Sequence, residues 1–318
     1  MNVFIITEGN AQTGYGHLTR CLSIYQGFEG HDITPTLIAI CDENGKKVLG
    51  NISLRAFDWI ENQEKLVEMI SGADIAIIDS YLADLPLYVR IYKSVKKTVY
   101  LDDTLRLDYP PGTIINGAVN AEFLPYAMDD QHSYLLGLDY TPMRKAFWDI
   151  PERVQKDKVE NVLITIGGND TRGVTFQVLE AVRKSFPILT YHVVMGFNNI
   201  NEYREQYDQL DNIFFYHSLD EYEIRELMIK CDLAISAAGQ TTYELIRTAI
   251  PSIFIQIVDN QQNNIQGWHE KKAINQIITL NDDFYLQKVV LAVEKFILPN
   301  ELEFPGTGVE AIVKRIIA

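Results

Sequence analysis

Short apolar runs rich in β-branched residues alternate with stretches of helical periodicity along most of the chain. In the first half, such runs occupy residues 3–7, 36–40, 75–79 and 98–102. They are continuously apolar, as strands buried on both faces are, and such strands occur in parallel sheets that helices cover on both sides. The alternation therefore predicts an α/β domain with a doubly wound parallel sheet.

The same alternation restarts after a less regular, proline-containing stretch from Tyr109 to about Asp157. We expect the domain junction within this stretch and a second parallel sheet beyond it. The strands of that sheet are predicted at residues 161–166, 191–195, 212–217, 233–237 and 252–257.

The predicted organisation is an N-terminal Rossmann-like domain over residues 1–145, a C-terminal Rossmann-like domain over residues 158–300 and a C-terminal helix over residues 301–318. Ligands of open α/β sheets bind outside the carboxyl ends of the strands. We therefore expect two doubly wound parallel-sheet domains that face a central cleft and carry the functional residues there.

The charge of the chain excludes several classes of partner. It has 28 Lys and Arg against 43 Asp and Glu, a formal net charge of -15, which repels nucleic-acid backbones and anionic membrane surfaces. No run of about 18 apolar residues is present, and the first residues lack the basic region of a signal peptide. We expect a cytoplasmic protein with no nucleic-acid partner, no membrane insertion and no obligate protein partner.

Neither the cysteines nor the acidic pairs predict a metal site. Cys21, Cys41 and Cys231 have no CxxC or Cys/His spacing, which suits a reducing compartment and three small buried side chains. Asp102 and Asp103 are sequential residues at a predicted strand, so their side chains point to opposite faces and do not converge on one ion. We expect neither a metal ion nor a cofactor.

A glycine-rich segment follows the first predicted strand and delivers Gly14, Gly16 and His17 to the start of a helix predicted from residue 16 to residue 28. Glycines let the backbone approach a ligand closely, and the first N–H groups of a helix attract anionic oxygens. The positive end of the helix dipole is expected to keep His17 neutral and available as a base. The alternative is that His17 only hydrogen-bonds the neighbouring loop. The segment matches neither the Rossmann GxGxxG pattern nor a Walker loop.

Asp79 and Tyr81 follow the strand predicted at residues 75–79, on the sheet edge that also carries His17. Asp79, or another acid at this edge, can orient the imidazole through the ring nitrogen that is not used as the base. We therefore predict His17, Asp79 and Tyr81 as the catalytic residues.

Two more glycine turns follow strands in the second half of the chain. The helix after the second turn can hold a diphosphate at its N–H groups, and Glu244, one turn further on, can accept hydrogen bonds from ribose hydroxyls. The amide-rich run over residues 260–264 suits sugar hydroxyls. An exposed helix carboxylate and an ordinary polar loop are the alternatives. The predicted binding residues are Gly14, Gly16, Gly167, Gly168, Asn169, Ser236, Gly239, Gln240, Thr241, Glu244, Asn260 and Gln261.

Together these segments resemble the UDP-2,4-diacetamido-2,4,6-trideoxy-β-L-altropyranose hydrolases of pseudaminic acid biosynthesis, which are related in fold to the glycosyltransferases that complete lipid-linked peptidoglycan precursor. The resemblance covers most of the chain. It implies a GT-B-like fold, a metal-independent reaction, UDP held mainly by the second domain, and activation of water by His17. The matching positions are Gly14, Tyr15, Gly16, His17, Arg20, Cys21, Asp79, Tyr81, Asp102, Asp103, Asn120, Tyr126, Gly137, Leu138, Asp139, Tyr140, Arg144, Phe147, Gly167, Gly168, Asn169, Asp170, Ser236, Ala237, Ala238, Gly239, Thr241, Glu244, Asn260 and Gln261.

The chain departs from the family pattern at three positions near the first glycine segment. Ile6, Glu8 and Ser80 stand where family members commonly have Arg, Asp and His. These changes lie in the domain that the resemblance assigns to the sugar, so a related sugar is an open alternative.

The leading hypothesis is hydrolysis of a UDP-activated diacetamido-trideoxy sugar by attack of water at the anomeric carbon, in a pathway of the pseudaminic acid type. Two alternatives remain. A GT-B glycosyltransferase would use the same donor with an acceptor hydroxyl in place of water, and fold alone does not separate the two reactions. A non-catalytic module that binds a UDP-sugar would need no base, and His17 argues against it.

Overall fold

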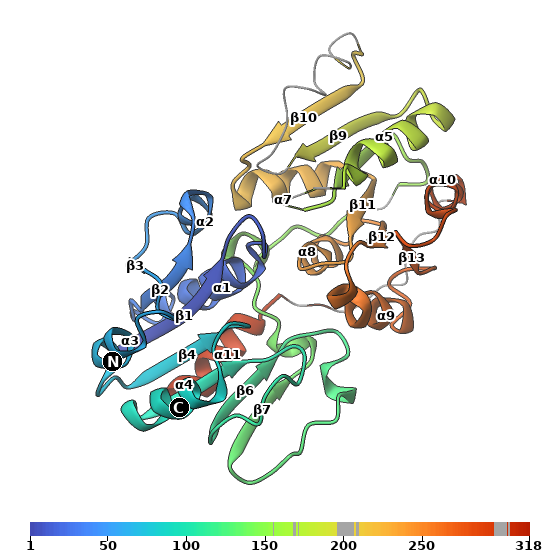
Figure 1. Ribbon diagram of the computed structural model, residues 1–318. Coiled ribbons are helices and arrows are strands. Elements are labelled where there is room, and N and C mark those ends of the chain that lie inside the picture. The colour runs from blue at the N-terminus through green and yellow to red at the C-terminus, as the bar shows by residue number, and fades with distance from the viewer. Residues whose placement is uncertain are drawn as a thin grey trace. The chain divides into compact units, whose positions relative to one another are not determined.

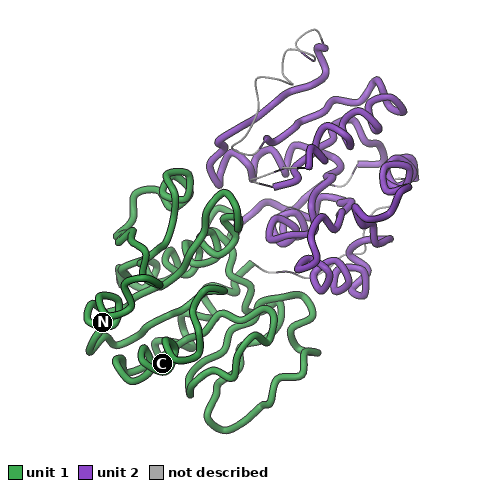
Figure 2. Tube along the Cα trace, in the orientation of Figure 1, with its two compact units in different colours: residues 1–148, 305–318 green, residues 149–304 purple. Residues whose placement is uncertain are grey.

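The chain divides into two units, each built on one parallel sheet (Figure 2). Unit 1 comprises residues 1–148 and 305–318, and unit 2 comprises residues 149–304. The structure is a computed structural model that describes residues 1–154, 156–167, 170, 172–195, 207, 210–295, 304 and 306–318. No helix in these ranges is long and apolar enough to cross a membrane.

The sheet of unit 1 has seven parallel strands in the order β3-β2-β1-β4-β5-β6-β7 (Figure 1). The order reverses between β1 and β4, and Thr7 of β1 lies opposite Asp79 of β4. Such a reversal leaves a crevice at the carboxyl ends of the two strands. The strands are β1 (Val3–Gly9), β2 (Thr36–Cys41), β3 (Leu54–Ala56), β4 (Ile75–Asp79), β5 (Lys97–Leu101), β6 (Gly112–Asn116) and β7 (His132–Leu136).

Helices cover both faces of this sheet because successive side chains of β1 are apolar and point to opposite sides. Val3 and Ile5 pack into the layer of α1 and α11, whereas Phe4 and Ile6 pack into the layer of α3 and α4. The helical segments of unit 1 are α1 (Gly16–Glu29), α2 (Glu43–Leu49), α3 (Gln63–Ile70), α4 (Leu85–Ser94), η1 (Ala121–Phe123), η2 (Leu138–Tyr140), η3 (Lys145–Phe147) and α11 (Gly308–Ile317).

The C-terminal helix α11 belongs to unit 1, although the whole of unit 2 separates it in the sequence from the rest of unit 1. Its apolar face, which includes Val309 and Val313, packs into the same core as α1. A Cβ atom on Gly27 of α1 would lie 2.2 Å from Val309 Cγ1, so the glycine permits the two helices to approach. The Lys97 ammonium also donates a 2.7 Å hydrogen bond to the Ile316 carbonyl. Unit 1 is therefore completed by the end of the chain.

The sheet of unit 2 has six parallel strands in the order β10-β9-β8-β11-β12-β13, with its reversal between β8 and β11 (Figure 1). Its strands are β8 (Asn161–Thr165), β9 (Thr190–Met195), β10 (Ile213–His217), β11 (Leu233–Ala237), β12 (Ser252–Gln256) and β13 (Ile278–Thr279). Its described helical segments are α5 (Val174–Ser185), α7 (Glu221–Lys230), α8 (Thr241–Arg247), η4 (Asp259–Gln261), α9 (Gln262–Glu270) and α10 (Tyr285–Lys295).

Two doubly wound parallel sheets confirm the predicted architecture, and every predicted strand is present within one or two residues of its expected position. The stretch from Tyr109 to about Asp157 is expected to be irregular, and this expectation is wrong for its first half. Strands β6 and β7 lie there and extend the sheet of unit 1. Their runs are short and partly polar, so they do not resemble the buried central strands. The very short β3 and β13 were not expected for the same reason.

Candidate active site

The loop between β1 and α1 carries the glycine-rich segment. The Asn10 side chain accepts hydrogen bonds from the N–H groups of Gln12 (2.8 Å) and Thr13 (3.1 Å), and the Gly14 N–H bonds the Asn10 carbonyl at 2.8 Å. Gly14 has φ +88°, in the left-handed region where glycine is favoured. This short turn brings His17 into the first turn of α1.

A second glycine fixes how closely the helix approaches the strand. A Cβ atom on Gly9, the last residue of β1, would lie 2.7 Å from Leu18 Cγ. Leu18 is completely buried, so it has little room to move. The N-terminus of α1 is thereby held at the carboxyl edge of the sheet.

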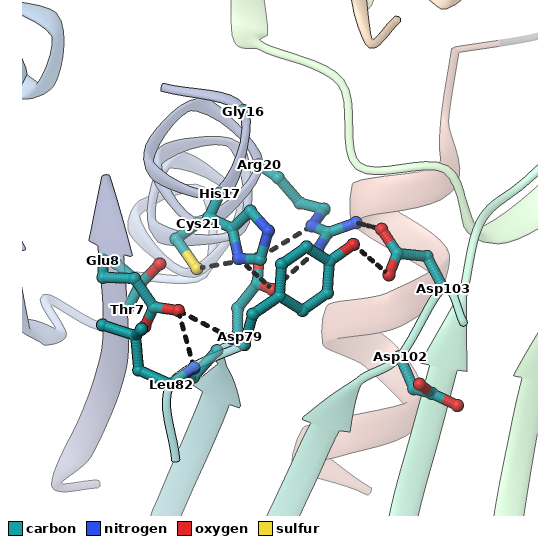
Figure 3. A network of polar contacts seen from close by, with 12 residues as sticks. Thr7, Glu8, Gly16, His17, Arg20, Cys21, Asp79, Leu82, Asp102 and Asp103 are labelled. Carbon is teal, nitrogen blue, oxygen red and sulfur yellow. Dashed lines mark hydrogen bonds and ion pairs between the residues drawn. The ribbon is translucent and has the colours of Figure 1, made fainter. Parts of the chain in front are cut away.

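His17 and Asp79 meet at this edge (Figure 3). His17 Nδ1 lies 3.0 Å from Asp79 Oδ1, an ion-pair distance, although the two groups are not aligned as a hydrogen bond. The Asp79 side chain is 1% exposed and that of His17 is 19% exposed. The predicted contact between the imidazole and a carboxylate is present, and Asp79 supplies that carboxylate.

Arg20 binds the same carboxylate from the next turn of α1. Its Nη2 lies 2.6 Å from Asp79 Oδ1 and its Nε lies 2.7 Å from Asp79 Oδ2, a two-pronged geometry that fixes both oxygens. Its Nη1 also bonds Asp103 Oδ2 at 3.1 Å. Burial opposes ionisation of Asp79, but the charges of Arg20 and His17 hold the pKa of this carboxyl well below its usual range.

The protonation of His17 differs from the expectation based on the helix dipole. Burial lowers the pKa of His17, but the charge of Asp79 and, more weakly, that of Glu8 raise it, and the net pKa is raised despite Arg20. The expectation that His17 resists protonation is therefore wrong. A nearby carboxylate outweighs the partial charge of the helix end because it carries a full charge at short distance.

Tyr81 lies against His17 and is joined to Asp103. The two rings meet edge to face with centroids 4.4 Å apart, and the Tyr81 hydroxyl donates a 2.6 Å hydrogen bond to Asp103 Oδ1. Burial and the Asp103 charge raise the pKa of the Tyr81 phenol well above its usual range. The phenol therefore stays protonated and acts as a hydrogen-bond donor and a packing surface, and Tyr81 is 43% exposed.

Glu8 is a further carboxylate in this group that no motif marked as functional. It is buried at the end of β1, and its Oε1 accepts hydrogen bonds from the N–H groups of Tyr81 (2.6 Å) and Leu82 (3.3 Å). Burial raises the pKa of Glu8 more than its hydrogen bonds and the charge of His17 lower it. The only sequence signal was that the family commonly has Asp at this position.

Asp102 and Asp103 have separate surroundings, as predicted, although both lie just beyond β5 and not on the strand. The Asp102 side chain accepts hydrogen bonds from the hydroxyls of Tyr109 and Tyr126, whereas Asp103 faces Arg20 and Tyr81. Among the residues that the structure describes, no group of three or more His, Cys, Asp or Glu side chains is arranged to hold a metal ion.

The first glycine turn of unit 2 follows β8. Gly167 has φ +112° and is exposed, while the predicted binding residues Gly168 and Asn169 lie outside the described residues. Asp170 caps α5, since its two carboxylate oxygens accept the N–H groups of Val174 (2.9 Å) and Thr175 (2.7 Å). The Asp170 carboxylate therefore stabilises the N-terminus of α5.

The second turn of unit 2 joins β11 to α8. Ser236 is buried at the end of β11, Gln240 is the N-terminal cap position of α8, and Thr241 is its first residue. Glu244 lies in the first turn of the same helix and is half-buried. The predicted residues of this turn are therefore neighbours, as their spacing requires.

The amide-rich run after β12 folds onto this turn. The Asn264 amide donates to the carbonyls of Ala238 (2.8 Å) and Gly239 (3.1 Å). A Cβ atom on Gly239 would lie 3.4 Å from Gln261 Nε2, whereas Asn260 is exposed. The suggestion that the whole run serves sugar hydroxyls is wrong for Asn264, because its amide is bound to backbone of the turn.

The amino-acid sequence of the chain is similar to those of several described proteins. A protein of Helicobacter pylori described as a pseudaminic acid cytidylyltransferase and UDP-2,4-diacetamido-2,4,6-trideoxy-β-L-altropyranose hydrolase is 27% identical over 264 residues, which cover 82% of this chain and 45% of that protein. The spore coat polysaccharide biosynthesis protein SpsG of Bacillus subtilis is 22% identical over 287 residues, 86% of this chain and 82% of that protein. The chain thus spans about half the length of the Helicobacter pylori relative. No family model matches the chain.

Solved structures share the fold. MurG of Acinetobacter baumannii superposes with a TM-score of 0.59 at 12% identity, covering 100% of this chain and 99% of the other. The UDP-GlcNAc 2-epimerase of Methanocaldococcus jannaschii superposes with a TM-score of 0.63 at 13% identity, over 100% and 99% of the two chains. The GT-B-like fold is therefore confirmed, and the chain is a sequence relative of the UDP-diacetamido-trideoxy-altropyranose hydrolase that its motifs resemble.

Proposed function

We propose that this chain is a hydrolase that releases UDP from a UDP-activated diacetamido-trideoxy sugar, within a pathway of the pseudaminic acid type. One observation carries the proposal: a histidine at the carboxyl edge of the sheet is paired, through one ring nitrogen, with a buried aspartate, 3.0 Å away. Such a pair activates the other ring nitrogen as a general base. The sequence similarity to a protein described as a hydrolase of this sugar nucleotide supports the same assignment.

In the proposed reaction, His17 Nε2 takes a proton from water while the water oxygen attacks the anomeric carbon. The bond between that carbon and the diphosphate oxygen breaks, and UDP leaves with the electron pair. Asp79 stabilises the imidazolium that forms, because its Oδ1 lies 3.0 Å from Nδ1. A raised pKa makes His17 a stronger base once it is neutral.

The positive charge of Arg20 compensates the negative charge of Asp79 beside His17. Arg20 binds both oxygens of Asp79, so Asp79 stays ionised in an interior where a lone carboxylate would take up a proton. It also opposes protonation of His17, which limits how far Asp79 raises the pKa of the imidazole. We assign Arg20 a positioning role. Tyr81 and Asp103 supply the exposed face on which the sugar would lie next to His17.

We propose that unit 2 binds UDP. Support comes from the turn between β11 and α8, where small residues leave backbone N–H groups at the start of a helix. Gln240 and Thr241 begin that helix, and Glu244 is the candidate for the ribose hydroxyls. Gln261 is a further candidate, because its side-chain amide lies beside Gly239.

The test is an assay of the purified protein with a panel of UDP-sugars, without acceptor, in isotopically labelled water and with excess chelator present. The hydrolase predicts UDP release, with the label in the free sugar and none in UDP, because the bond at the anomeric carbon is the one that breaks. Label in the phosphate would contradict attack at carbon. UDP release that requires an added sugar or lipid acceptor would instead identify a transferase, and tight binding without turnover would identify a binding module.

A further inference from the structure

The turn that follows β4 carries Tyr81 to His17, and a carboxylate from another strand holds it. Glu8 Oε1 accepts the Tyr81 N–H at 2.6 Å and the Leu82 N–H at 3.3 Å. Glu8 is 6% exposed, so these charge-assisted hydrogen bonds are shielded from water. They tie the end of β1 to the turn over residues 80–82 (Figure 3).

The Tyr81 side chain contacts its neighbours through both its hydroxyl and its ring. Its hydroxyl bonds Asp103 and its ring touches His17, but the residue remains 43% exposed. Ser80 fixes the later part of the turn, since its Oγ accepts the N–H groups of Leu82 and Ala83 at 3.0 Å each. The Tyr81 N–H donates to Glu8, so this carboxylate fixes the backbone at Tyr81.

The second oxygen of Glu8 has a different environment. Oε2 is buried and makes no hydrogen bond within the part of the chain that the structure describes. A buried oxygen without a donor is costly to maintain. The Ser80 side chain also interacts with this carboxylate and lowers its pKa, so the whole turn over residues 80–82 faces Glu8.

We propose that Glu8 is a positioning residue that fixes the turn over residues 80–82, and thereby holds the Tyr81 ring against His17. Its consequence for turnover rests on the proposed function, but the contact between the two rings does not. The negative charge of Glu8 also acts on the imidazole, together with Asp79 from β4, Asp103 from the loop after β5 and the opposing charge of Arg20 on α1.

The experiment follows the His17 imidazole by NMR in the intact chain, labelled at histidine and without substrate. A His17→Asn variant assigns the resonance, and Tyr81→Leu gives its position when the neighbouring ring is removed. Glu8→Ala removes the acceptor, Glu8→Gln keeps an acceptor oxygen but no charge, and Glu64→Gln is the control for loss of one charge. Glu64 is 84% exposed and pairs with Arg90.

In Glu8→Ala, the His17 resonance is expected to move most of the way to its position in Tyr81→Leu. In Glu8→Gln, the resonance at high pH should stay near the parent position, while the pKa of His17 falls below that of the parent and of Glu64→Gln. If Glu8→Ala does not yield folded protein, Glu8→Asp replaces it, because its shorter side chain withdraws the acceptor. A parent-like resonance in a folded Glu8→Ala or Glu8→Asp variant would overturn the proposal.

Turnover adds a second measurement. With the substrate found in the panel assay, Glu8→Ala should lower kcat on the order of tenfold to a hundredfold, as expected when a group beside the reacting atoms is misplaced, and Glu8→Gln should recover part of that loss. If no UDP-sugar is hydrolysed, the proposed function fails, while the resonance of His17 still decides whether Glu8 positions Tyr81. If turnover occurs and Glu8→Ala leaves it unchanged with a parent-like resonance, Glu8 has no positioning role.

Discussion

Asp79 Oδ1 lies 3.0 Å from His17 Nδ1, although the two residues belong to different strand-helix units of the first sheet. The contact follows from topology. Strands β1 and β4 are parallel neighbours, so the loop after β1 and the last residue of β4 reach the same edge. The glycine turn then rotates α1 so that His17 and Arg20, three residues apart, face the same carboxylate.

The first prediction concerns Asp79→Asn. The amide leaves Arg20 with Asp103 as its remaining carboxylate partner. Removal of one member of a buried ion pair typically costs about 3–5 kcal/mol in the free energy of unfolding, and the contact with Asp103 should keep the loss near the lower end of that range. Loss of the charge should also lower turnover on the order of a hundredfold or more, because the imidazolium is no longer stabilised. Urea unfolding and UDP release measure the two effects. Asp108→Asn, a change at an exposed carboxylate, should alter neither strongly.

The second prediction is the pH dependence of the rate. The pKa of His17 is raised by Asp79, so the acid limb of kcat/KM should have its midpoint above the ordinary histidine value, and the rate should fall as pH drops through it. The linked effect on stability has the opposite sense: protonated His17 contributes stability at low pH, and this contribution is lost as pH rises through the folded-state pKa. In Asp79→Asn the midpoint should move to lower pH. A midpoint below that of free histidine in the parent would contradict the pairing.

Most of the fold could be predicted from the sequence because buried parallel strands are long, continuous apolar runs. β4 has no polar residue before Asp79, its last position, and β11 has only Ser236. Strands at the sheet margins lack this pattern, so β6 and β7 were not expected. The position of α11 on α1 depends on a contact between Gly27 and Val309, which no local pattern encodes.

The candidate site was predicted in part. The pairing of His17 with an acid followed from strand order, but which acid, and the effect on the pKa, required distances. Glu8 illustrates the limit: a carboxylate at the end of an apolar strand has no motif, and its function depends on two N–H groups of a distant turn. Asn264 is the opposite example: it lies in an amide-rich run that suits a sugar, but its side-chain amide donates to the backbone carbonyl of Ala238.

The third prediction is that His17→Asn retains UDP-sugar binding but loses the chemical step. Asparagine is close in size to imidazole and keeps a hydrogen bond, but it cannot accept a proton near neutral pH. Turnover should fall on the order of a hundredfold to ten-thousandfold, with the dissociation constant little changed. If more than about a tenth of the activity remained, well above what loss of a general base allows, His17 would be a structural residue and Asp79 the better candidate for the base.

The fourth prediction concerns the nucleotide. Glu244→Ala should weaken UDP binding roughly tenfold to a hundredfold, the effect of losing a charge-assisted hydrogen bond. Titration calorimetry with UDP measures this change, and Glu270→Ala, on the exposed end of α9, is the matched control. Equal UDP affinity in the parent and in Glu244→Ala would mean that this carboxylate does not contact the ribose.

The fifth prediction tests whether the C-terminal helix is part of unit 1. A methyl group on Gly27 would lie 2.2 Å from Val309 Cγ1 and 3.0 Å from Val313 Cγ2, so Gly27→Ala should separate α1 from α11. Overpacking of this kind costs about 1–3 kcal/mol, measured as a lower midpoint of urea unfolding. Val309→Ala removes the nearest methyl group, so the double variant should be more stable than the sum of the two single changes predicts, as residues in direct contact are not additive. Strictly additive changes would show that the two helices do not meet at Gly27.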